Sequence, residues 1–128
     1  MSDFSSLVDP LTKLADERGW SPTPIQAASQ TQILDGSDHL LIAPTGSGKT
    51  EAAVMPLLSR AIKDKWQPMC ILYITPLRAL NRDIDRRISS LSQACGLRSD
   101  VRHGDTTQSQ RTKQSRNPPH LLVTTPET

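Results

Sequence analysis

Residues 40–50 read Leu40-Leu41-Ile42-Ala43-Pro44-Thr45-Gly46-Ser47-Gly48-Lys49-Thr50. The first four residues form an apolar run of strand length, and the glycines then interrupt the pattern as a turn would. A helical pattern follows from about Lys49 to Lys65. Pro56 lies inside that pattern and removes one helix hydrogen bond, which predicts a kink or a later helix start. The segment therefore predicts a strand, a loop and a helix in direct succession.

The same alternation of apolar runs and helical patterns continues downstream. Residues 70–75, 97–103 and 120–125 are strand-like, and residues 107–116 are polar and compatible with a helix. A further helix that ends at Gly96 is marked by one apolar face, made of Leu77, Leu80, Ile84, Ile88 and Leu91. Strands that alternate with helices at this spacing predict an α/β fold, with a parallel sheet and helices on both faces.

Two short helices are expected before the first strand. An apolar periodicity predicts a helix that ends near Arg18. Thr23 has the side chain of an N-cap and Pro24 suits the first helical position, so a second helix is expected from Pro24 to about Leu34.

Length and composition predict one modest domain. The 128 residues are 35% hydrophobic and carry a net charge of +2, which excludes a polycationic tail that binds nucleic acid by charge alone. Residues 1–50 carry three basic and six acidic side chains, whereas residues 51–128 carry twelve and seven, so the second part favours an anionic partner. No apolar run has the length of a membrane span, and Cys70 and Cys95 lack the spacing of a metal site. We therefore expect a cytoplasmic protein.

The glycine-containing loop matches the P-loop pattern, apart from Ala43 where the first glycine usually stands. Gly46 and Gly48 let the backbone curl so that its N–H groups point at phosphate oxygens. Lys49 is expected to reach the β- and γ-phosphates, and the Thr50 hydroxyl is expected to ligate Mg²⁺. The pattern predicts binding of ATP and Mg²⁺, and it makes Lys49 and Thr50 the catalytic candidates. The residues expected to bind the nucleotide are Thr45, Gly46, Ser47, Gly48, Lys49 and Thr50.

A second requirement of P-loop ATPases is missing from the later strand-like runs. Such enzymes hold the Mg²⁺ shell with an aspartate at the end of an apolar strand. Neither residues 70–75 nor residues 120–125 end in a carboxylate. Two alternatives stay open: a P-loop phosphotransferase that does without this aspartate, or a sequence that stops before reaching it.

Four segments resemble motifs of superfamily 2 helicases, in the order found in the first RecA-like domain of those enzymes. Gly19-Trp20-Ser21-Pro22-Thr23-Pro24-Ile25-Gln26 resembles the Q motif, and residues 43–50 resemble motif I, where alanine is usual at the first position. Thr75-Pro76-Leu77-Arg78-Ala79-Leu80-Asn81 resembles motif Ia, and Thr124-Thr125-Pro126-Glu127 resembles motif Ib. Similarity to the large helicase-related (Lhr) branch is greatest over residues 77–84, 101–106 and 117–119.

The resemblance implies a RecA-like P-loop NTPase domain, of which residues 1–128 are the N-terminal part. It places the DExH motif after Thr128, followed by a second RecA-like domain. The full-length protein would be an ATP-dependent helicase or translocase acting on DNA or RNA, in a branch linked to DNA repair, while this part alone would be inactive. Gln26 would read adenine, and Phe4 would correspond to the aromatic residue that stacks on it. Contacts with the backbone of a single strand would come from Arg78, Thr125 and Pro126.

Other interpretations remain beside this one. A small P-loop kinase would turn over nucleotide without DNA or RNA, and a non-hydrolysing module would bind ATP without turnover. Gly104 either lets a nucleic-acid backbone approach or simply ends a strand. Residues 82–87 carry three arginines that alternate with two aspartates, so ordinary surface ion pairs are expected there.

Overall fold

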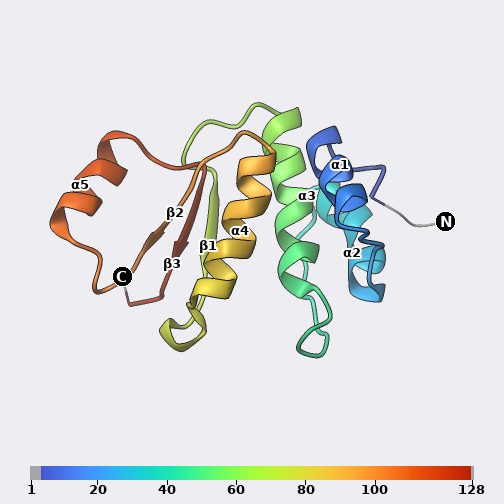
Figure 1. Ribbon diagram of the computed structural model, residues 1–128, viewed down its shortest axis with the longest axis horizontal. Coiled ribbons are helices and arrows are strands. Elements are labelled where there is room, and N and C mark those ends of the chain that lie inside the picture. The colour runs from blue at the N-terminus through green and yellow to red at the C-terminus, as the bar shows by residue number, and fades with distance from the viewer. Residues whose placement is uncertain (1–3, 128) are drawn as a thin grey trace. The chain divides into compact units, whose positions relative to one another are not determined.

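The computed structural model describes residues 4–127. The chain forms two compact units, Met1–Lys65 and Trp66–Thr128. The described part of the first unit is helical, whereas the second contains a parallel sheet with its own helices (Figure 1). The P-loop belongs to the first unit, and the segments that resemble motifs Ia and Ib belong to the second.

Three helices build the first unit: α1 (Asp9–Glu17), α2 (Pro24–Leu34) and α3 (Lys49–Lys63). The predicted end of α1 and the predicted bounds of α2 are confirmed, and Thr23 is the N-cap residue of α2. Proline fits the first position of α2 because an N–H there would have no acceptor within the helix. The largest fully buried apolar side chains of this unit are Leu11, Val54, Met55 and Leu58, and Ser59 is buried among the core residues as well.

The long helix α3 begins at Lys49, within the P-loop, so the later start, one of the two predicted alternatives, is wrong. It continues through Pro56, which is buried. Proline inside a helix costs about 3 kcal/mol. Its neighbours Val54, Met55 and Leu58 are each at most 1% exposed, and each such burial stabilises by about 1.5–3 kcal/mol. Packing on both sides of the proline therefore outweighs the lost hydrogen bond.

The apolar run before the P-loop does not form the predicted strand. Residues 40–43 have no paired neighbour among the described residues, and Leu40 and Ile42 are 84% and 81% exposed. A strand needs a neighbour to bond its backbone N–H and C=O groups. The three strands that do pair all lie in the second unit. This prediction is wrong, although the loop and helix that follow it lie where they were expected.

Three parallel strands form the sheet of the second unit: β1 (Ile71–Ile74), β2 (Ser99–Arg102) and β3 (Leu121–Thr124), in the order β1-β3-β2. The last residues of β1 and β2 are both in register with Thr124. The three strands therefore end level, and the loops that follow them gather at one edge. The core of this unit is made by Ile71, Ile88, Leu91, Leu121 and Val123.

The helix after β1 begins later than its apolar pattern predicts. Leu77 belongs to a short 3-10 turn, η1 (Leu77–Ala79), and is 55% exposed. The helix itself is α4 (Arg82–Ala94), and the Asn81 side chain accepts the Ile84 N–H at 3.0 Å. An asparagine in this position caps a helix and separates it from the preceding turn.

The remaining helix, α5 (Gln108–Arg116), covers the outer edge of β2. Gln114 Nε2 donates to the Val101 carbonyl at 2.9 Å. The Asp100 carboxylate accepts the Val101 N–H at 2.8 Å. Side chains thus bond both backbone groups of Val101, which protects this edge strand from pairing with another chain.

Candidate functional site

The P-loop, residues 44–50, folds as a tight turn that leads into α3. Gly46 and Gly48 have φ angles of 82° and 81°, left-handed values that glycine adopts without steric cost. The Pro44 carbonyl accepts both the Ser47 N–H, at 3.2 Å, and the Ser47 hydroxyl, at 2.6 Å. These two hydrogen bonds hold the loop in a defined turn.

Hydrogen-bond donors are available where this loop becomes a helix. The N–H groups of Gly48, Lys49 and Thr50 have no acceptor within the described part of the chain, as is usual in a first helical turn. The Lys49 side chain is exposed, and that of Thr50 is half-buried. Free N–H groups, the helix dipole and a lysine together suit a phosphate group. The residues present fit the triphosphate of ATP, with the Thr50 hydroxyl as the group that would ligate Mg²⁺.

Gln26 connects the first turn of α2 to the P-loop. Its Oε1 accepts the Thr23 N–H at 3.0 Å, and its Nε2 donates to the Gly48 carbonyl at 3.1 Å. The side chain is 8% exposed, and a Cβ added at Gly48 would collide with its amide nitrogen. An amide has two N–H groups and two acceptor lone pairs, so one of each is still unused. Gln26 and the P-loop residues are thus brought together.

Phe4 has a different environment from the one that the family resemblance implies. Phe4 is 6% exposed and lies beside Gln26, Met55 and Pro56. The structure places Phe4 in the helical core, where the ring is not presented to a nucleotide.

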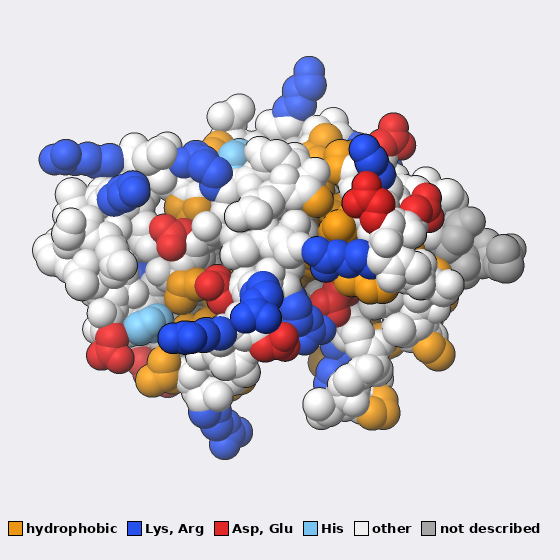
Figure 2. Space-filling model, in the orientation of Figure 1, with side chains coloured by type: hydrophobic (Ala, Val, Ile, Leu, Met, Phe, Trp, Pro, Cys, Tyr) orange, Lys and Arg blue, Asp and Glu red, His pale blue; other side chains and the backbone are white. Residues whose placement is uncertain are grey.

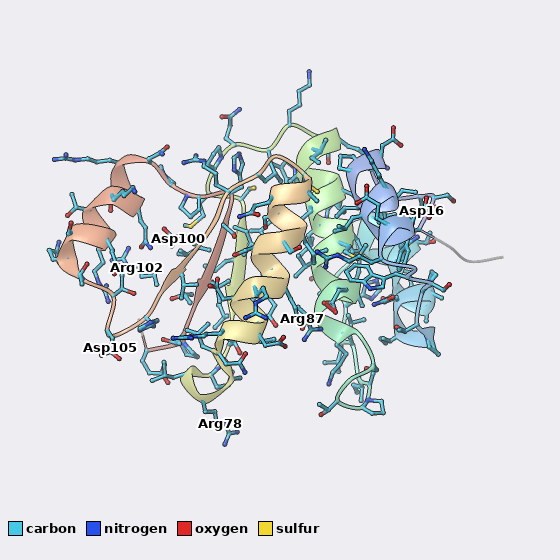
Figure 3. The ribbon with its side chains drawn as sticks, in the orientation of Figure 1. Asp16, Arg78, Arg87, Asp100, Arg102 and Asp105 are labelled. Carbon is cyan, nitrogen blue, oxygen red and sulfur yellow. The ribbon has the colours of Figure 1, made fainter. Side chains whose placement is uncertain are left out.

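The second part of the candidate site lies at the carboxyl edge of the sheet. Arg78, in η1, is exposed and extends away from the sheet (Figure 3). Pro126 is also exposed, whereas the Thr125 side chain is only 3% exposed. Arg78 and Pro126 therefore present surface at this edge of the sheet, whereas Thr125 is buried.

A third loop ends at the same edge, and sequence reasoning left its role open. Residues 103–106 follow β2, and Asp105 lies at the same end of the sheet as Arg78 (Figure 3). The loop is bonded to itself: the His103 N–H donates to Thr106 Oγ1 at 2.8 Å, and the Thr106 N–H donates to the His103 carbonyl at 3.0 Å. Arg111 of α5 also binds this loop, and nothing in the polar pattern of that helix pointed to such a contact.

For Arg87 of α4, the predicted surface ion pair is confirmed. Arg87 Nη1 lies 3.5 Å from Asp83 Oδ2, an ion pair between residues four apart on the helix. Basic and acidic side chains gather together over the first turns of α4 in Figure 2. An exposed pair of this kind stabilises by about 0.2–1 kcal/mol. This ion pair forms between neighbouring side chains on the helix surface and needs no bound partner to explain it.

No other chemical centre is apparent within residues 4–127. No group of three His, Cys, Asp or Glu residues there could hold a metal ion, and no helix is long and apolar enough to cross a membrane. Burial raises the pKa of the Cys95 thiol to about 11, and it also raises the pKa of Cys70. Both thiols are therefore protonated at neutral pH, where only a thiolate is a strong nucleophile.

A parallel α/β sheet and a P-loop that opens a helix define the chain as part of a P-loop NTPase of the RecA-like class. The family model described as DEAD/DEAH box helicase matches residues 23–128. The chain belongs to this helicase family, as the N-terminal region of a superfamily 2 helicase of the Lhr branch.

Relatives of the Lhr branch are similar over most of this chain. It is 37% identical over 122 residues to the ATP-dependent helicase Lhr-Core of Methanocaldococcus jannaschii, a match that covers 82% of this chain and 14% of that protein. It is 38% identical over 122 residues to the Lhr helicase/probable uracil glycosylase of Mycolicibacterium smegmatis, with 84% and 8% covered. The structure of Mycobacterium smegmatis helicase Lhr bound to ssDNA and AMP-PNP matches with a TM-score of 0.79 at 33% identity, covering 99% of this chain and 18% of that one. The chain thus spans a small part of the length of these relatives.

Proposed function

We propose that the full-length protein is an ATP-dependent helicase or translocase, and that this chain forms the N-terminal part of its first RecA-like domain. The observation that carries the proposal is the hydrogen bond from Gln26 to the Gly48 carbonyl. It holds a side chain suited to base recognition against the start of the P-loop helix. Adenine presents an N–H donor beside an acceptor nitrogen, and this pair complements the acceptor and donor that Gln26 leaves unused.

The residues of the first unit would bind the nucleotide in two places. Gln26 would contact the base, and the N–H groups of Gly48, Lys49 and Thr50 would donate to the phosphates. Lys49 would balance the charge of the β- and γ-phosphates, and the Thr50 hydroxyl would ligate Mg²⁺. When bound, Mg-ATP supplies the free energy of phosphoanhydride cleavage. The Ser47 N–H is not counted among these donors, because it donates to the Pro44 carbonyl.

The residues of the second unit would bind the nucleic acid. Arg78 is a flexible, exposed cation at the carboxyl edge, where it would contact a phosphate. The exposed Pro126 of the Thr125-Pro126 turn would add apolar contacts at the same edge. Phosphates are alike in every sequence, so this surface is expected to bind a single strand without sequence preference. A role in DNA repair stays a prediction from the branch.

The outer edge of β1 favours the continuation of the sheet in the full-length protein. β1 pairs only with β3 among the described strands, and its side chains Leu72 and Ile74 are 55% and 58% exposed. Side chains protect the β2 edge, whereas β1 offers an apolar strand that is free to pair. We place the DExH motif and the second RecA-like domain in the remainder of the protein.

The test is nucleic-acid-stimulated ATP hydrolysis by the full-length protein. We expect single-stranded DNA or RNA to stimulate turnover, and Lys49→Ala to reduce turnover by at least about 100-fold, because a charged donor to the phosphates is lost. Lys13→Ala is the matched control, since Lys13 is an exposed lysine of α1. Turnover that ignores nucleic acid would favour the small kinase, and ATP binding without turnover would favour the non-hydrolysing module.

A further inference from the structure

We propose that Arg111 is a positioning residue for nucleic-acid binding. It would hold the loop of residues 103–106 in the shape that presents the Gly104 N–H to a phosphate of the bound strand. This inference rests on the proposed function and adds a residue on α5 to it.

Arg111 binds the loop at both of its ends. Its Nη2 donates to the His103 carbonyl at 2.9 Å, and its Nε donates to the Thr106 carbonyl at 3.3 Å. The Nε and Nη2 donors form one rigid side of the guanidinium plane, so they set the distance between these carbonyls. A lysine has a single point charge and cannot reproduce the pair. The half-buried Arg111 therefore acts as a clamp on the loop.

All but one of the backbone N–H groups of residues 103–106 donate a hydrogen bond within this loop. The N–H groups of His103, Asp105 and Thr106 all donate to atoms of the loop itself, and the Thr107 N–H donates to Gln110 Oε1 at 3.0 Å. Within residues 4–127, the Gly104 N–H has no acceptor. Gly104 is exposed. The loop thus offers one backbone donor to a partner outside this chain.

Nothing in the described structure requires a glycine at position 104. The other five glycines have positive φ angles, which explains why a side chain is unfavourable there. Gly104 has no such angle, and a Cβ built on it would meet no atom within 4 Å. A glycine without these constraints leaves the surface of the loop open to the close approach of another molecule.

The location of the loop identifies the kind of molecule that approaches. Arg102, the last residue of β2, is in register with Thr124 of β3, so this loop ends at the same edge as Arg78 and Pro126. Backbone N–H groups are common donors to nucleic-acid phosphates. A strand that crosses this edge would therefore meet Arg78 and the Gly104 N–H on one surface.

The experiment measures single-stranded DNA binding by the full-length protein as a function of salt concentration. Arg111→Lys and Arg111→Gln should each weaken binding by about 5-fold, the factor that one lost hydrogen bond corresponds to. The slope of log affinity against log salt should stay unchanged, because Arg111 touches the loop and not a phosphate. ATP affinity should also stay unchanged. Arg116→Gln, at an exposed arginine of the same helix, is the control and should bind as the wild type does.

A second comparison separates positioning from general damage to the fold. Gly104→Ala should weaken binding in the wild-type protein, but it should add little to Arg111→Lys, because both changes remove the same contact. If the Arg111 variants do not fold, Thr106→Val is the substitute, since it removes the acceptor of the His103 N–H and leaves Arg111 in place. It should give the same 5-fold loss of affinity.

Three results would overturn the inference. Unchanged affinity in these loop variants would show that the loop makes no contact with the strand. Retained binding by Arg111→Lys, with a salt slope lowered by about 0.7 in Arg111→Gln, would make Arg111 itself a phosphate contact. Additive losses of affinity in the Gly104→Ala, Arg111→Lys double variant would show that the two residues do not act through the same contact. If the wild type binds no DNA, the proposed function fails as well. If the wild type binds DNA and these variants bind it equally well, only this inference fails and the proposed function stands.

Discussion

Replacing Gly48 by alanine should destabilise the first unit more than the same change at Gly46. The two glycines share almost the same φ, 81° and 82°. Each alanine therefore has the same left-handed penalty of about 1–2 kcal/mol. Nothing lies within 4 Å of a Cβ at Gly46, whereas a Cβ at Gly48 collides with the amide nitrogen of Gln26.

The additional cost at Gly48 can be estimated from the bonds of the displaced amide. Gln26 would lose its bonds to the Gly48 carbonyl and to the Thr23 N–H. At about 0.5–1.5 kcal/mol each, Gly48→Ala should cost about 1–3 kcal/mol more than Gly46→Ala. The change that alanine makes in the unfolded chain is common to both variants and cancels in the comparison.

Hydrogen exchange at the α2 and α3 amides of the full-length protein measures this difference as a local opening free energy. In a Gln26→Ala background the obstacle is gone, so Gly48→Ala should then cost no more than Gly46→Ala. Equal costs of the two glycine variants in the wild-type background would refute the reasoning. An excess cost at Gly48 that persists without the Gln26 side chain would refute it too.

Two further predictions concern the second unit. The pKa of His120 lies below its ordinary value of 6.5 because of burial and the nearby Arg98 charge, and its Nδ1 accepts the Arg98 N–H at 3.1 Å. The stability that neutral His120 contributes should be complete above pH 6.5 and should be lost as the pH falls through the lowered pKa. The measurement is the urea midpoint of unfolding as a function of pH. The same pH dependence in His120→Ala and in the wild type would contradict this prediction. Asn81→Ala should cost about 1 kcal/mol, because the cap on the Ile84 N–H is lost. Asn81→Ser should keep most of that stability in thermal unfolding, and an equal loss in both variants would show that the cap contributes nothing.

Local signals allowed much of the fold to be predicted from the sequence. Pro24 and its neighbour Thr23 define the start of α2, because their preferred conformations belong to the first turn itself. The strand expected at residues 40–43 failed because a strand depends on a partner elsewhere in the chain. The helix expected from Leu77 failed for a local reason, since the apolar spacing runs past Asn81, whose side chain caps the helix at that point.

The candidate site depends more strongly on contacts between distant residues. Gln26 and Gly48 are 22 residues apart, and no spacing rule announces that one amide joins them. The glycines show the same limit, because a glycine can be needed for its backbone angle or for the space that a side chain would fill. Gly46 and Gly104 both stand in loops after apolar runs, yet one has a φ of 82° and the other has no positive φ. Only the geometry assigns the first to the shape of the P-loop and shows that the second is needed neither for its backbone angle nor for packing.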